Sequence, residues 1–329
     1  MVDLIFSDRK GAVLTHPSIP CLLPFHTINL TAGCSFSCRY CYAQSFRNYP
    51  GKGKVVFYAN TFQALAEQLP RKRKAPDMVF FSSACDPFAP FPQTLECLHD
   101  CMSLLLKAGS RILISTKGII PTRFIELFAQ HHDRVYVEIG LTTVDDDIRQ
   151  LLEPCAPSVP ERLRLLKELG VAGVSLEIRM IPLIPELTDD EDRFEHIMAA
   201  VSRCGVTRGS MSYLFLRPGN LECMECRYGD WRFREIESRI FTKQLESPDR
   251  RSSIMVPASG YRANKYKVLR VIALSHGIHL RLCSCKNPDL ANECCHPLAE
   301  FSGGGTCRPK EKTGNLFAKL ESRKISRID

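Results

Sequence analysis

Residues 33–42 read Gly-Cys-Ser-Phe-Ser-Cys-Arg-Tyr-Cys-Tyr, and they place Cys34, Cys38 and Cys41 in the spacing C-x3-C-x2-C. An apolar segment, residues 26–32, comes directly before them. Three thiols this close in sequence cannot all point into an apolar core, but one loop can direct them at a single metal cluster. A [4Fe–4S] cluster normally takes four thiolates. Three cysteines therefore predict a cluster whose last iron is open to a ligand that is not protein.

A zinc knuckle, or a disulfide with one spare thiol, is the alternative interpretation of this loop. Structural zinc sites favour cysteine pairs that are repeated far apart in the sequence, rather than one run of three. Polar residues also follow several of the later predicted strands, and a zinc knuckle does not explain them. The spacing therefore favours a cluster over zinc.

The composition is that of a globular chain with metal or redox chemistry. The 329 residues are 44% hydrophobic, which suffices for one large α/β domain with an appendage or for two domains. We find no run of about 18 apolar residues and no signal-peptide pattern at the start, so we expect no membrane association. The expected location is the cytoplasm, where the 16 cysteines point to metals before disulfides.

Strand and helix patterns alternate along the chain and predict six βα repeats. Short apolar strands that alternate with helices imply a parallel sheet. A doubly wound sheet and a barrel fit this pattern equally well. The predicted strands span residues 25–32, 78–82, 111–115, 135–141, 174–180 and 211–216, and the predicted helices span residues 61–69, 93–108, 121–131, 145–152, 160–169 and 189–204.

The cysteine run, with an aromatic residue before its last cysteine, resembles the signature of the radical S-adenosylmethionine (SAM) enzymes. The resemblance implies that Cys34, Cys38 and Cys41 hold a [4Fe–4S] cluster, that SAM binds the open iron, and that the backbone around Tyr40 lies against the adenine of SAM. In that family the reduced cluster cleaves SAM to methionine and a 5′-deoxyadenosyl radical, which abstracts a hydrogen atom from the substrate. The resemblance also implies a reducing partner such as a flavodoxin or a ferredoxin.

The same resemblance decides the predicted fold class, which is α/β: a partial (β/α)6 TIM-type barrel with a cysteine-rich C-terminal extension. In such a barrel the cluster loop follows the first strand. We expect an N-terminal lead-in over residues 1–24, the barrel over residues 25–220, the extension over residues 221–310 and a charged tail over residues 311–329.

Polar residues follow the second and third predicted strands, and in parallel α/β folds the chemistry gathers at the carboxyl ends of strands. Here the sequence resembles the spore photoproduct lyase group. The resemblance implies that Asp86, with Ser83 behind it, contacts the amino group of SAM, that Lys117 faces its carboxylate, and that Cys85 donates a hydrogen atom to a carbon radical. The alternatives are an Asp-Pro turn, an exposed loop lysine and a small buried cysteine.

The fourth and fifth predicted strands carry charged residues within apolar runs. Alternation puts Glu177 and Arg179 on one face of their strand. Glu138 needs a partner, because a lone carboxylate on a barrel strand is costly. We expect Glu138 to contact the ribose of SAM or a basic group, and Arg179 to bind the carboxylate of SAM or to form a structural ion pair. Residues 141–154 and 181–189 also resemble the spore photoproduct lyase group.

A second set of cysteines follows the predicted barrel and argues for a second metal site. Cys283, Cys285, Cys294 and Cys295 are nearest one another in the sequence and are the predicted ligands. An auxiliary iron–sulfur cluster is the first interpretation, because several radical SAM groups append one. Structural zinc with His296 among its ligands is the second, and free surface thiols are the third.

The formal net charge is +8, and two basic stretches bear on the choice of substrate. Residues 71–74 become a phosphate contact only if they lie at the mouth of the active site, and residues 261–267 fit a nucleic-acid surface or an ordinary helix. We predict a radical SAM enzyme that removes hydrogen from a substrate, with nucleic acid as the candidate by analogy with spore photoproduct lyase. The alternative is a non-catalytic nucleic-acid-binding protein with structural zinc, which does not explain the run of three cysteines.

Overall fold

A seven-stranded parallel sheet forms the centre of the computed structural model. The structure describes residues 2–17, 19–81, 83–217, 231–247, 253–291 and 293. The strand order across the sheet is β12-β9-β8-β7-β6-β5-β2. These strands are β2 (His26–Ile28), β5 (Met78–Phe81), β6 (Arg111–Thr116), β7 (Val135–Gly140), β8 (Ser175–Leu183), β9 (Arg208–Tyr213) and β12 (His279–Leu282).

The order of the strands distinguishes the two folds that the helix and strand pattern left open. From β2 to β12, each strand of the sheet lies beside the next one along the chain, so the order never reverses. A doubly wound sheet reverses its order at a switch point and carries helices on both faces, whereas a barrel keeps winding in one direction. The predicted partial TIM-type barrel is therefore confirmed, with β12 as a seventh strand that the sequence did not predict.

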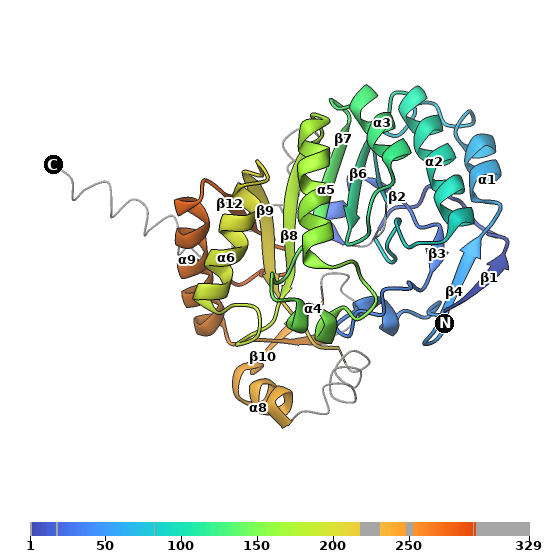
Figure 1. Ribbon diagram of the computed structural model, residues 1–329. Helices are drawn as coiled ribbons and strands as arrows, with labels where there is room; N and C mark the ends of the chain where they lie inside the picture. Colours follow the sequence, from blue (N-terminus) through green and yellow to red (C-terminus); the bar gives the residue numbers. More distant parts are fainter. Residues whose placement is uncertain are drawn as a thin grey trace.

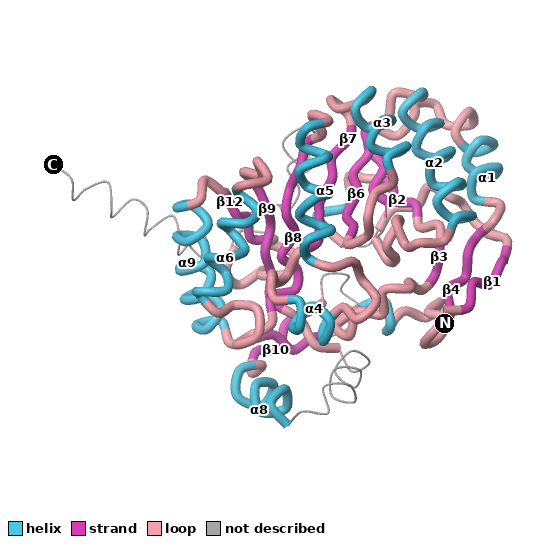
Figure 2. The backbone as a smooth tube through the Cα atoms, viewed as in Figure 1, coloured by secondary structure: helices cyan, strands magenta, loops and turns pink. Residues whose placement is uncertain are grey.

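A layer of helices covers one face of the sheet (Figures 1 and 2). Their starts follow local rules: Pro92 opens one helix at its first turn, and Ser158 and Glu161 form a capping box that opens another. The predicted helices are all present, with ends shifted by no more than two residues. The layer consists of α1 (Thr61–Gln68), α2 (Pro92–Lys107), α3 (Thr122–Gln130), α5 (Val159–Val171), α6 (Glu191–Ser202) and α9 (Ser259–Ser275).

The face of the sheet beneath the helices is apolar. Val79, Ile112, Val137 and Met211 lie on four different strands, are fully buried or nearly so, and share one cluster with the helices. Because successive strand residues point to opposite faces, their neighbours in sequence lie on the inner face. The main core therefore lies between the helix layer and the sheet, and it leaves the inner face for other chemistry.

The inner face carries polar and charged side chains in its middle. The strand registers align Ser115 with Glu138 and Glu138 with Glu177, across three neighbouring strands. Two residues farther along β8, the registers align Arg179 with Ser210, and Ser210 with Arg281. Such a row cannot be an apolar core, so the inner face has the composition of a binding surface at its centre.

The N-terminal lead-in has structure that the sequence did not predict. A second, three-stranded sheet contains β1 (Asp3–Ser7), β4 (Lys54–Tyr58) and β3 (Thr31–Ala32) in that order. The predicted strand over residues 25–32 is therefore split, because its first part pairs with β5 and its second part pairs with β4. This division turns the chain toward the cysteine loop.

Three smaller elements, α4, α8 and β10, lie at one end of the large sheet (Figure 1). The carboxylate of Asp145 accepts hydrogen bonds from two backbone amides of the first turn of α4, so the acidic start of this helix is a cap, as its sequence favoured. The predicted last strand, residues 211–216, lies three residues earlier in the chain. The remaining elements are η1 (Pro20–Leu22), η2 (Tyr42–Ser45), α4 (Asp146–Leu152), α8 (Trp231–Ile240), β10 (Lys243–Glu246) and β11 (Ser253–Val256).

Candidate functional site

The cysteine loop begins with a turn that requires glycine. Gly33 has a φ of +81°, and a Cβ atom there would lie 2.6 Å from the backbone oxygen of Lys54. Ser37 also adopts a positive φ, of 52°, between the first and second cysteines. Positive φ is unusual for residues other than glycine. The loop therefore holds a tight conformation that points its cysteines toward a common region.

Backbone hydrogen bonds fix this loop against the segment that follows β7. The amide of Arg39 donates to the carbonyl of Leu152 at 2.9 Å, and the amide of Cys155 donates to the carbonyl of Phe36 at 3.3 Å. The side chain of Gln44 donates to the carbonyl of Cys38 at 3.0 Å. The loop after the first strand of the large sheet is thus fastened at the carboxyl end of its fourth strand, where chemistry gathers in folds of this kind.

The thiols of the loop lie close enough to influence one another. Cys34, Cys38 and Cys41 are all half-buried. Burial raises the pKa of the Cys34 thiol, and the charges of Asp86 and Cys38 raise it further. Burial also raises the pKa of Cys38, as do the charges of Glu153 and Cys41. Such thiols ionise readily only when a positive group compensates their charge, as a metal centre does.

The spacing of these sulfurs fits a cluster better than a single ion. Among the described residues, the sulfurs of Cys34, Cys38 and Cys41 do not form a group within 4.8 Å of one another. One tetrahedral zinc ion, with Zn–S bonds of about 2.3 Å, holds its thiolate sulfurs about 3.8 Å apart. In a four-iron cluster each thiolate binds its own iron, so the sulfurs lie farther apart. The loop is therefore not arranged around a single zinc ion, and the cluster stays a prediction.

A buried charge network supports the middle of the loop. The hydroxyl of Tyr40 donates to the carboxylate of Glu153, which forms an ion pair of 2.6 Å with Arg162. Glu153 is 0% exposed and Arg162 is 1% exposed. Burial works against the ionisation of Glu153, but Arg162 and Lys117 outweigh it and lower the pKa of that carboxyl. Glu153 thus fixes the side chain of Tyr40, and the backbone of Tyr40 remains the part predicted to contact the adenine of SAM.

Lys117 lies beside this network. Its Nζ atom lies 5.6 Å from the centre of the Tyr40 ring, and its charge acts on both Cys38 and Glu153. The lysine passes across Gly140, where a Cβ atom would lie 2.8 Å from its Cγ atom. Lys117 therefore reaches the surroundings of the cysteine loop, as its predicted role requires, and Gly140 makes room for it.

Asp86 joins the ends of two strands. Its carboxylate accepts hydrogen bonds from the Thr116 hydroxyl at 2.6 Å, the Lys117 amide at 2.7 Å and the Phe88 amide at 3.0 Å. Burial raises the pKa of Asp86 despite these bonds. The turn-forming role that the sequence allowed is therefore present, and the contact with the amino group of SAM remains a prediction. The charge of Asp86 also acts on Cys34, which places the carboxylate near the loop.

Cys85 and Ser83 share one partner, Asn29. The side chain of Asn29 donates to the Ser83 hydroxyl at 2.9 Å and lies 3.8 Å from the Cys85 sulfur. The hydroxyl of Tyr42, from the cysteine loop, donates to the Ser83 carbonyl. Burial raises the pKa of Cys85, so its thiol keeps its hydrogen at neutral pH. The sequence did not single out Asn29, which connects the predicted pair to the end of β2.

Glu138 and Arg179 form an ion pair of 3.0 Å, with Glu138 2% and Arg179 17% exposed. The basic partner predicted for Glu138 is therefore Arg179. Glu177, on the same face, contacts Arg281 at 2.5 Å and 2.7 Å. These contacts are structural ion pairs on the inner face, and contacts of Glu138 and Arg179 with SAM remain predictions.

Comparison with known proteins decides the family. The sequence profile described as the radical SAM superfamily matches residues 28–198, which is more than half of the chain. This chain belongs to the radical SAM superfamily of enzymes. The matched residues include the cysteine loop and the predicted residues on β7 and β8, so the family assignment rests on the segment described above.

Sequence relatives of this radical SAM protein are distant. An uncharacterized protein of Mycobacterium tuberculosis is 26% identical over 205 residues, which cover 59% of this chain and 60% of that protein. A protein of Pseudomonas phage M6 named radical SAM Nalpha-GlyT isomerase is 23% identical over 254 residues, which cover 76% of this chain and 51% of that protein. The chain thus spans 60% of the length of the mycobacterial relative that it matches.

Solved structures support the fold of the radical SAM chain. A mutant of spore photoproduct lyase with bound AdoMet and dinucleoside spore photoproduct matches with a TM-score of 0.66 and 16% identity. The match covers 84% of this chain and 81% of that one. A second structure, spore photoproduct lyase with dinucleoside spore photoproduct, has a TM-score of 0.65 and 15% identity. At these identities the likeness concerns the fold.

The second predicted metal site differs from its prediction. Cys283 and Cys285 lie together, as predicted, but the third sulfur of their group belongs to Cys21, in the lead-in. Cys294 and Cys295 lie outside the described residues, so their predicted role stays a prediction. Cys21 carries no local signal, because its nearest partner, Cys285, is 264 residues away in sequence.

The two basic stretches occupy different parts of the fold. Residues 71–74 lie away from the cysteine loop, and two side chains of residues 261–267 are buried in the core. Residues 71–74 connect α1 with β5, and so they lie at the amino end of the strands, opposite the carboxyl end where the loop is fastened. Within residues 261–267, Arg262 and Tyr266 are buried and bind Asn287. Residues 71–74 are therefore not at the mouth of the active site, and residues 261–267 form part of helix α9, which was one of their two interpretations.

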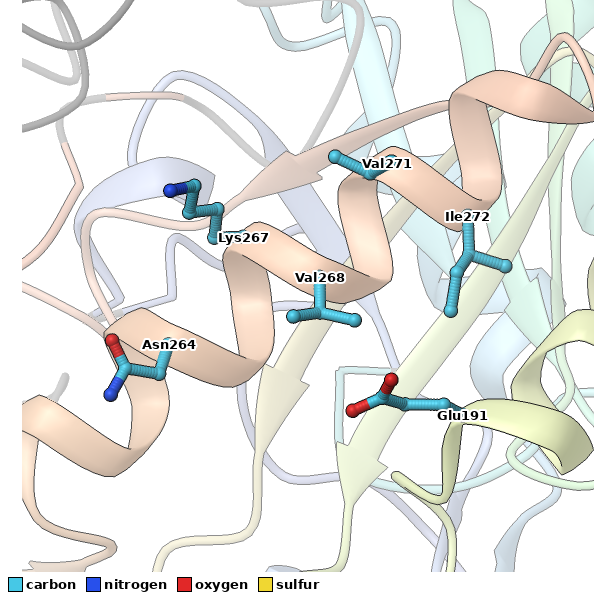
Figure 3. A pocket seen from close by; sticks show the side chains of 6 residues that line it. All are labelled: Glu191, Asn264, Lys267, Val268, Val271 and Ile272. Carbon is cyan, nitrogen blue, oxygen red and sulfur yellow. The ribbon is translucent and has the colours of Figure 1, made fainter.

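A pocket of about 450 Å³ lies between α6 and α9 on the outer helix layer (Figure 3). Val268 and Ile272 point from α9 toward Glu191 at the start of α6, with Asn264 and Lys267 along the same helix. It contains none of the predicted site residues, so it is separate from the cysteine loop. In the described part of the chain, no helix has both the length and the hydropathy needed to cross a bilayer.

Proposed function

We propose that this chain reductively cleaves SAM at a [4Fe–4S] cluster held by Cys34, Cys38 and Cys41, and that the resulting radical abstracts hydrogen from a substrate. One observation carries the proposal: three thiols of one rigid loop share a half-buried region at the carboxyl end of a radical SAM sheet. A loop with three cysteines supplies one ligand fewer than a [4Fe–4S] cluster normally takes. The remaining iron is the place for SAM.

When bound, the cluster supplies the electron that cleaves SAM, and the residues around the loop prepare the site for that event. Arg162 neutralises Glu153 at 2.6 Å, so the carboxylate that fixes Tyr40 is not an unpaired buried charge. Lys117 brings a positive charge toward Cys38 and offsets part of the negative charge of the thiolates. Its free position beside the loop supports the proposed contact with the SAM carboxylate.

Other proposed contacts with SAM involve residues that already have partners in the chain. Asp86 and Ser83 line the end of β5, and Glu138 and Arg179 pair on the inner face. The Asp86 carboxyl lies close enough to Cys34 to act on its pKa, which supports the proposed contact with the amino group. Arg179 keeps 17% of its side chain exposed, which supports the proposed contact with the SAM carboxylate, while Glu138, proposed to meet the ribose, is 2% exposed.

Cys85 is the proposed hydrogen donor. Its thiol is kept protonated by burial and lies 3.8 Å from the side chain of Asn29, at the end of β2. In the proposed step the S–H bond breaks, a C–H bond forms on the substrate radical, and the unpaired electron stays on sulfur. Replacement of Cys85 by alanine should change the distribution of products with the true substrate. An unchanged distribution would remove Cys85 from the reaction.

The proposed substrate is a nucleic acid. One named protein supports this class: spore photoproduct lyase, solved with a dinucleoside spore photoproduct. The net charge of +8 is compatible with a polyanion. Residues 71–74 do not add support, because they lie at the amino end of the strands. A flavodoxin or a ferredoxin is the proposed electron donor, and the cytoplasm is the proposed location.

The experiment that tests the cofactor is anaerobic purification followed by spectroscopy and metal analysis. We expect a brown protein with about four iron atoms per cysteine loop, and 5′-deoxyadenosine should form when SAM and a reductant are added. A colourless protein that contains only zinc would support the alternative, a non-catalytic nucleic-acid-binding protein. It would contradict the proposed reaction.

The substrate class is tested separately. The rate of 5′-deoxyadenosine formation is measured with single-stranded DNA, double-stranded DNA, RNA and a peptide mixture at matched concentrations. Stimulation by nucleic acid, at low and at moderate salt, supports the proposal. Stimulation by peptide alone would contradict the nucleic-acid substrate and would leave the cleavage of SAM intact.

A further inference from the structure

We propose that Cys21, Cys283 and Cys285 bind one zinc ion, which fastens the N-terminal segment to the last strand of the barrel sheet. The proposal is independent of the proposed reaction. It concerns a second site, made from residues that lie before the cysteine loop and after the last helix of the sheet.

The three sulfurs are the densest group of potential ligands in the described residues. Their Sγ atoms all lie within 4.8 Å of one another. Cys283 is 0% exposed and Cys21 is 7% exposed, while Cys285 is half-buried. The backbone amide of Cys21 donates to the Cys285 sulfur at 3.2 Å. Amide donors stabilise negative charge on a sulfur, so this contact suits a metal-bound thiolate.

The fold brings the group together with local turns on both sides. Cys21 lies in η1, where the amide of Leu22 donates to the carbonyl of Ile19 at 2.9 Å and the amide of Phe25 donates to the carbonyl of Leu22 at 2.9 Å. Cys283 directly follows β12, and its carbonyl accepts from the amides of Lys286 and Asn287 at 3.1 Å and 3.0 Å. The ligands are therefore preorganised by turns on rigid elements.

Asn287 locks the second of these turns into the core. It is 1% exposed, and its side chain accepts from Arg262 at 3.0 Å and from the Tyr266 hydroxyl at 3.0 Å. It also donates to the Cys283 carbonyl at 3.2 Å. A metal ligand is best held by partners that fix its backbone. Cys283 has such a partner in Asn287, which Arg262 and Tyr266 of α9 hold in place.

The surroundings of the three sulfurs are mainly apolar. Cys21 and Cys283 share a buried cluster with Phe25, Phe80 and Leu113 on the inner face of the sheet. Negative thiolates in such surroundings are costly without a compensating cation. One divalent ion supplies that compensation, and it explains why three thiols converge where apolar side chains alone would fill the space.

The distances favour zinc over an auxiliary iron–sulfur cluster. Around one zinc ion the sulfurs lie about 3.8 Å apart, which agrees with a group that fits within 4.8 Å. The thiolates of a four-iron cluster bind separate irons and are spread farther. The C-x-C spacing of Cys283 and Cys285 also keeps their sulfurs close. Three of the four tetrahedral positions are thus assigned.

This ion fastens the segment that precedes β2 to the end of β12. β12 is an edge strand, and an edge strand has only one pairing partner, which here is β9. Through the zinc ion, Cys21 is joined to Cys285, which lies shortly after β12 and 264 residues away in the sequence. Because binding occurs only in the folded chain, the zinc stabilises the fold.

Metal analysis of the full-length C34A/C38A/C41A variant tests the proposal. After anaerobic purification, we expect about one zinc and no iron per chain, because the cluster loop is disabled while Cys21, Cys283 and Cys285 remain. Iron in this variant, with the charge-transfer absorbance of a cluster, would overturn the assignment to zinc. Absence of both metals after purification with zinc present would overturn the site itself.

Cysteine variants in the same background locate the ion. Cys21→Ser should lose the zinc, while Cys204→Ser, which changes another buried cysteine, should retain it. Equal zinc content in the two variants would contradict the role of Cys21. Replacement of zinc by cobalt in the unchanged site gives a readout that does not depend on a folded variant. Intense visible bands with thiolate charge transfer are expected, and weak octahedral bands would overturn the proposal.

Failure of this proposal is distinguishable from failure of the proposed reaction. In the protein with all its cysteines, zinc without formation of 5′-deoxyadenosine would contradict the proposed reaction at the cysteine loop and leave the zinc site intact. Formation of 5′-deoxyadenosine without any zinc would contradict zinc binding by Cys21, Cys283 and Cys285 and leave the proposed reaction intact. The two sites therefore have separate readouts, iron with SAM cleavage for one and zinc for the other.

Discussion

The cysteine loop and the group of Cys21, Cys283 and Cys285 gather the same side chain in two different ways. The loop takes its three cysteines from eight consecutive residues, whereas the second group joins two chain segments 264 residues apart. Charged residues surround the loop, including Glu153 and Lys117. Apolar residues surround the second group.

This difference separates two uses of a thiolate. In the proposed cluster the loop leaves one iron for a ligand, and its charged neighbours suit a polar ligand such as SAM. The second group holds its sulfurs within 4.8 Å in an apolar core, which suits a closed structural ion. Charge beside one group and packing around the other therefore distinguish the proposed reactive centre from the proposed structural site.

The largest expected effect separates the two groups directly. The C34A/C38A/C41A variant should lose its iron and all formation of 5′-deoxyadenosine, because no other thiols lie on the loop. Activity and iron content are measured together. Cys155→Ala is the matched control, because this exposed cysteine adjoins the loop through its backbone amide and should keep both properties. Iron and activity in the triple variant would contradict the assignment of the cluster to Cys34, Cys38 and Cys41.

The charged surroundings of the loop are tested next. Glu153→Gln should lower the free energy of unfolding by about 3–5 kcal/mol, because it leaves the buried Arg162 without its ion pair. Denaturant unfolding measures this value. Glu186→Gln is the control: its pair with Arg239 is 2.8 Å long but the side chains are 42% and 55% exposed, so its loss should cost at most about 1 kcal/mol. Equal costs would contradict the account of the network.

Removal of the nearby positive charge should affect SAM more than the cluster. Lys117→Met should weaken SAM binding about tenfold, because one hydrogen bond to a charged group is lost. The visible absorbance of the cluster should remain. Lys107→Met, at the exposed end of α2, is the control and should bind SAM normally. Unchanged affinity of the Lys117 variant would contradict its assignment to the SAM carboxylate.

The smallest expected effect comes from the glycine that makes room for this lysine. Gly140→Ala places a methyl group 2.8 Å from the Cγ atom of Lys117, and the lysine must shift. We expect a loss of SAM affinity of about threefold, since a flexible side chain relieves part of the overlap. The effect should vanish when Lys117 is already methionine, because both changes act through one side chain. Additive losses would show that Gly140 acts by another route.

The sequence predicted the elements whose signals are local. The βα alternation located all six predicted strands and the helices between them, and the run from Cys34 to Cys41 indicated both family and fold. The winding of the sheet required a resemblance, because alternation alone fits a doubly wound sheet as well. The residues at strand ends were found because parallel strands bring their carboxyl ends together.

The features that the sequence missed depend on contacts between distant segments. Cys21 gains its importance from Cys285, and Asn29 from Ser83 and Cys85. β12 is a four-residue strand whose place is set by pairing with β9. Residues 261–267 form part of α9, the ordinary helix that was one of their two interpretations, and tertiary packing buries Arg262 and Tyr266. Such outcomes follow from packing, which a local pattern does not contain.

The most direct test of the central claim is electron paramagnetic resonance of the reduced protein, recorded with and without SAM. If Cys34, Cys38 and Cys41 hold a cluster with one open iron, the reduced protein gives a cluster signal. That signal should change when SAM binds and be absent from the C34A/C38A/C41A variant. A cluster signal that SAM leaves unchanged, or that persists in the triple variant, would contradict the account.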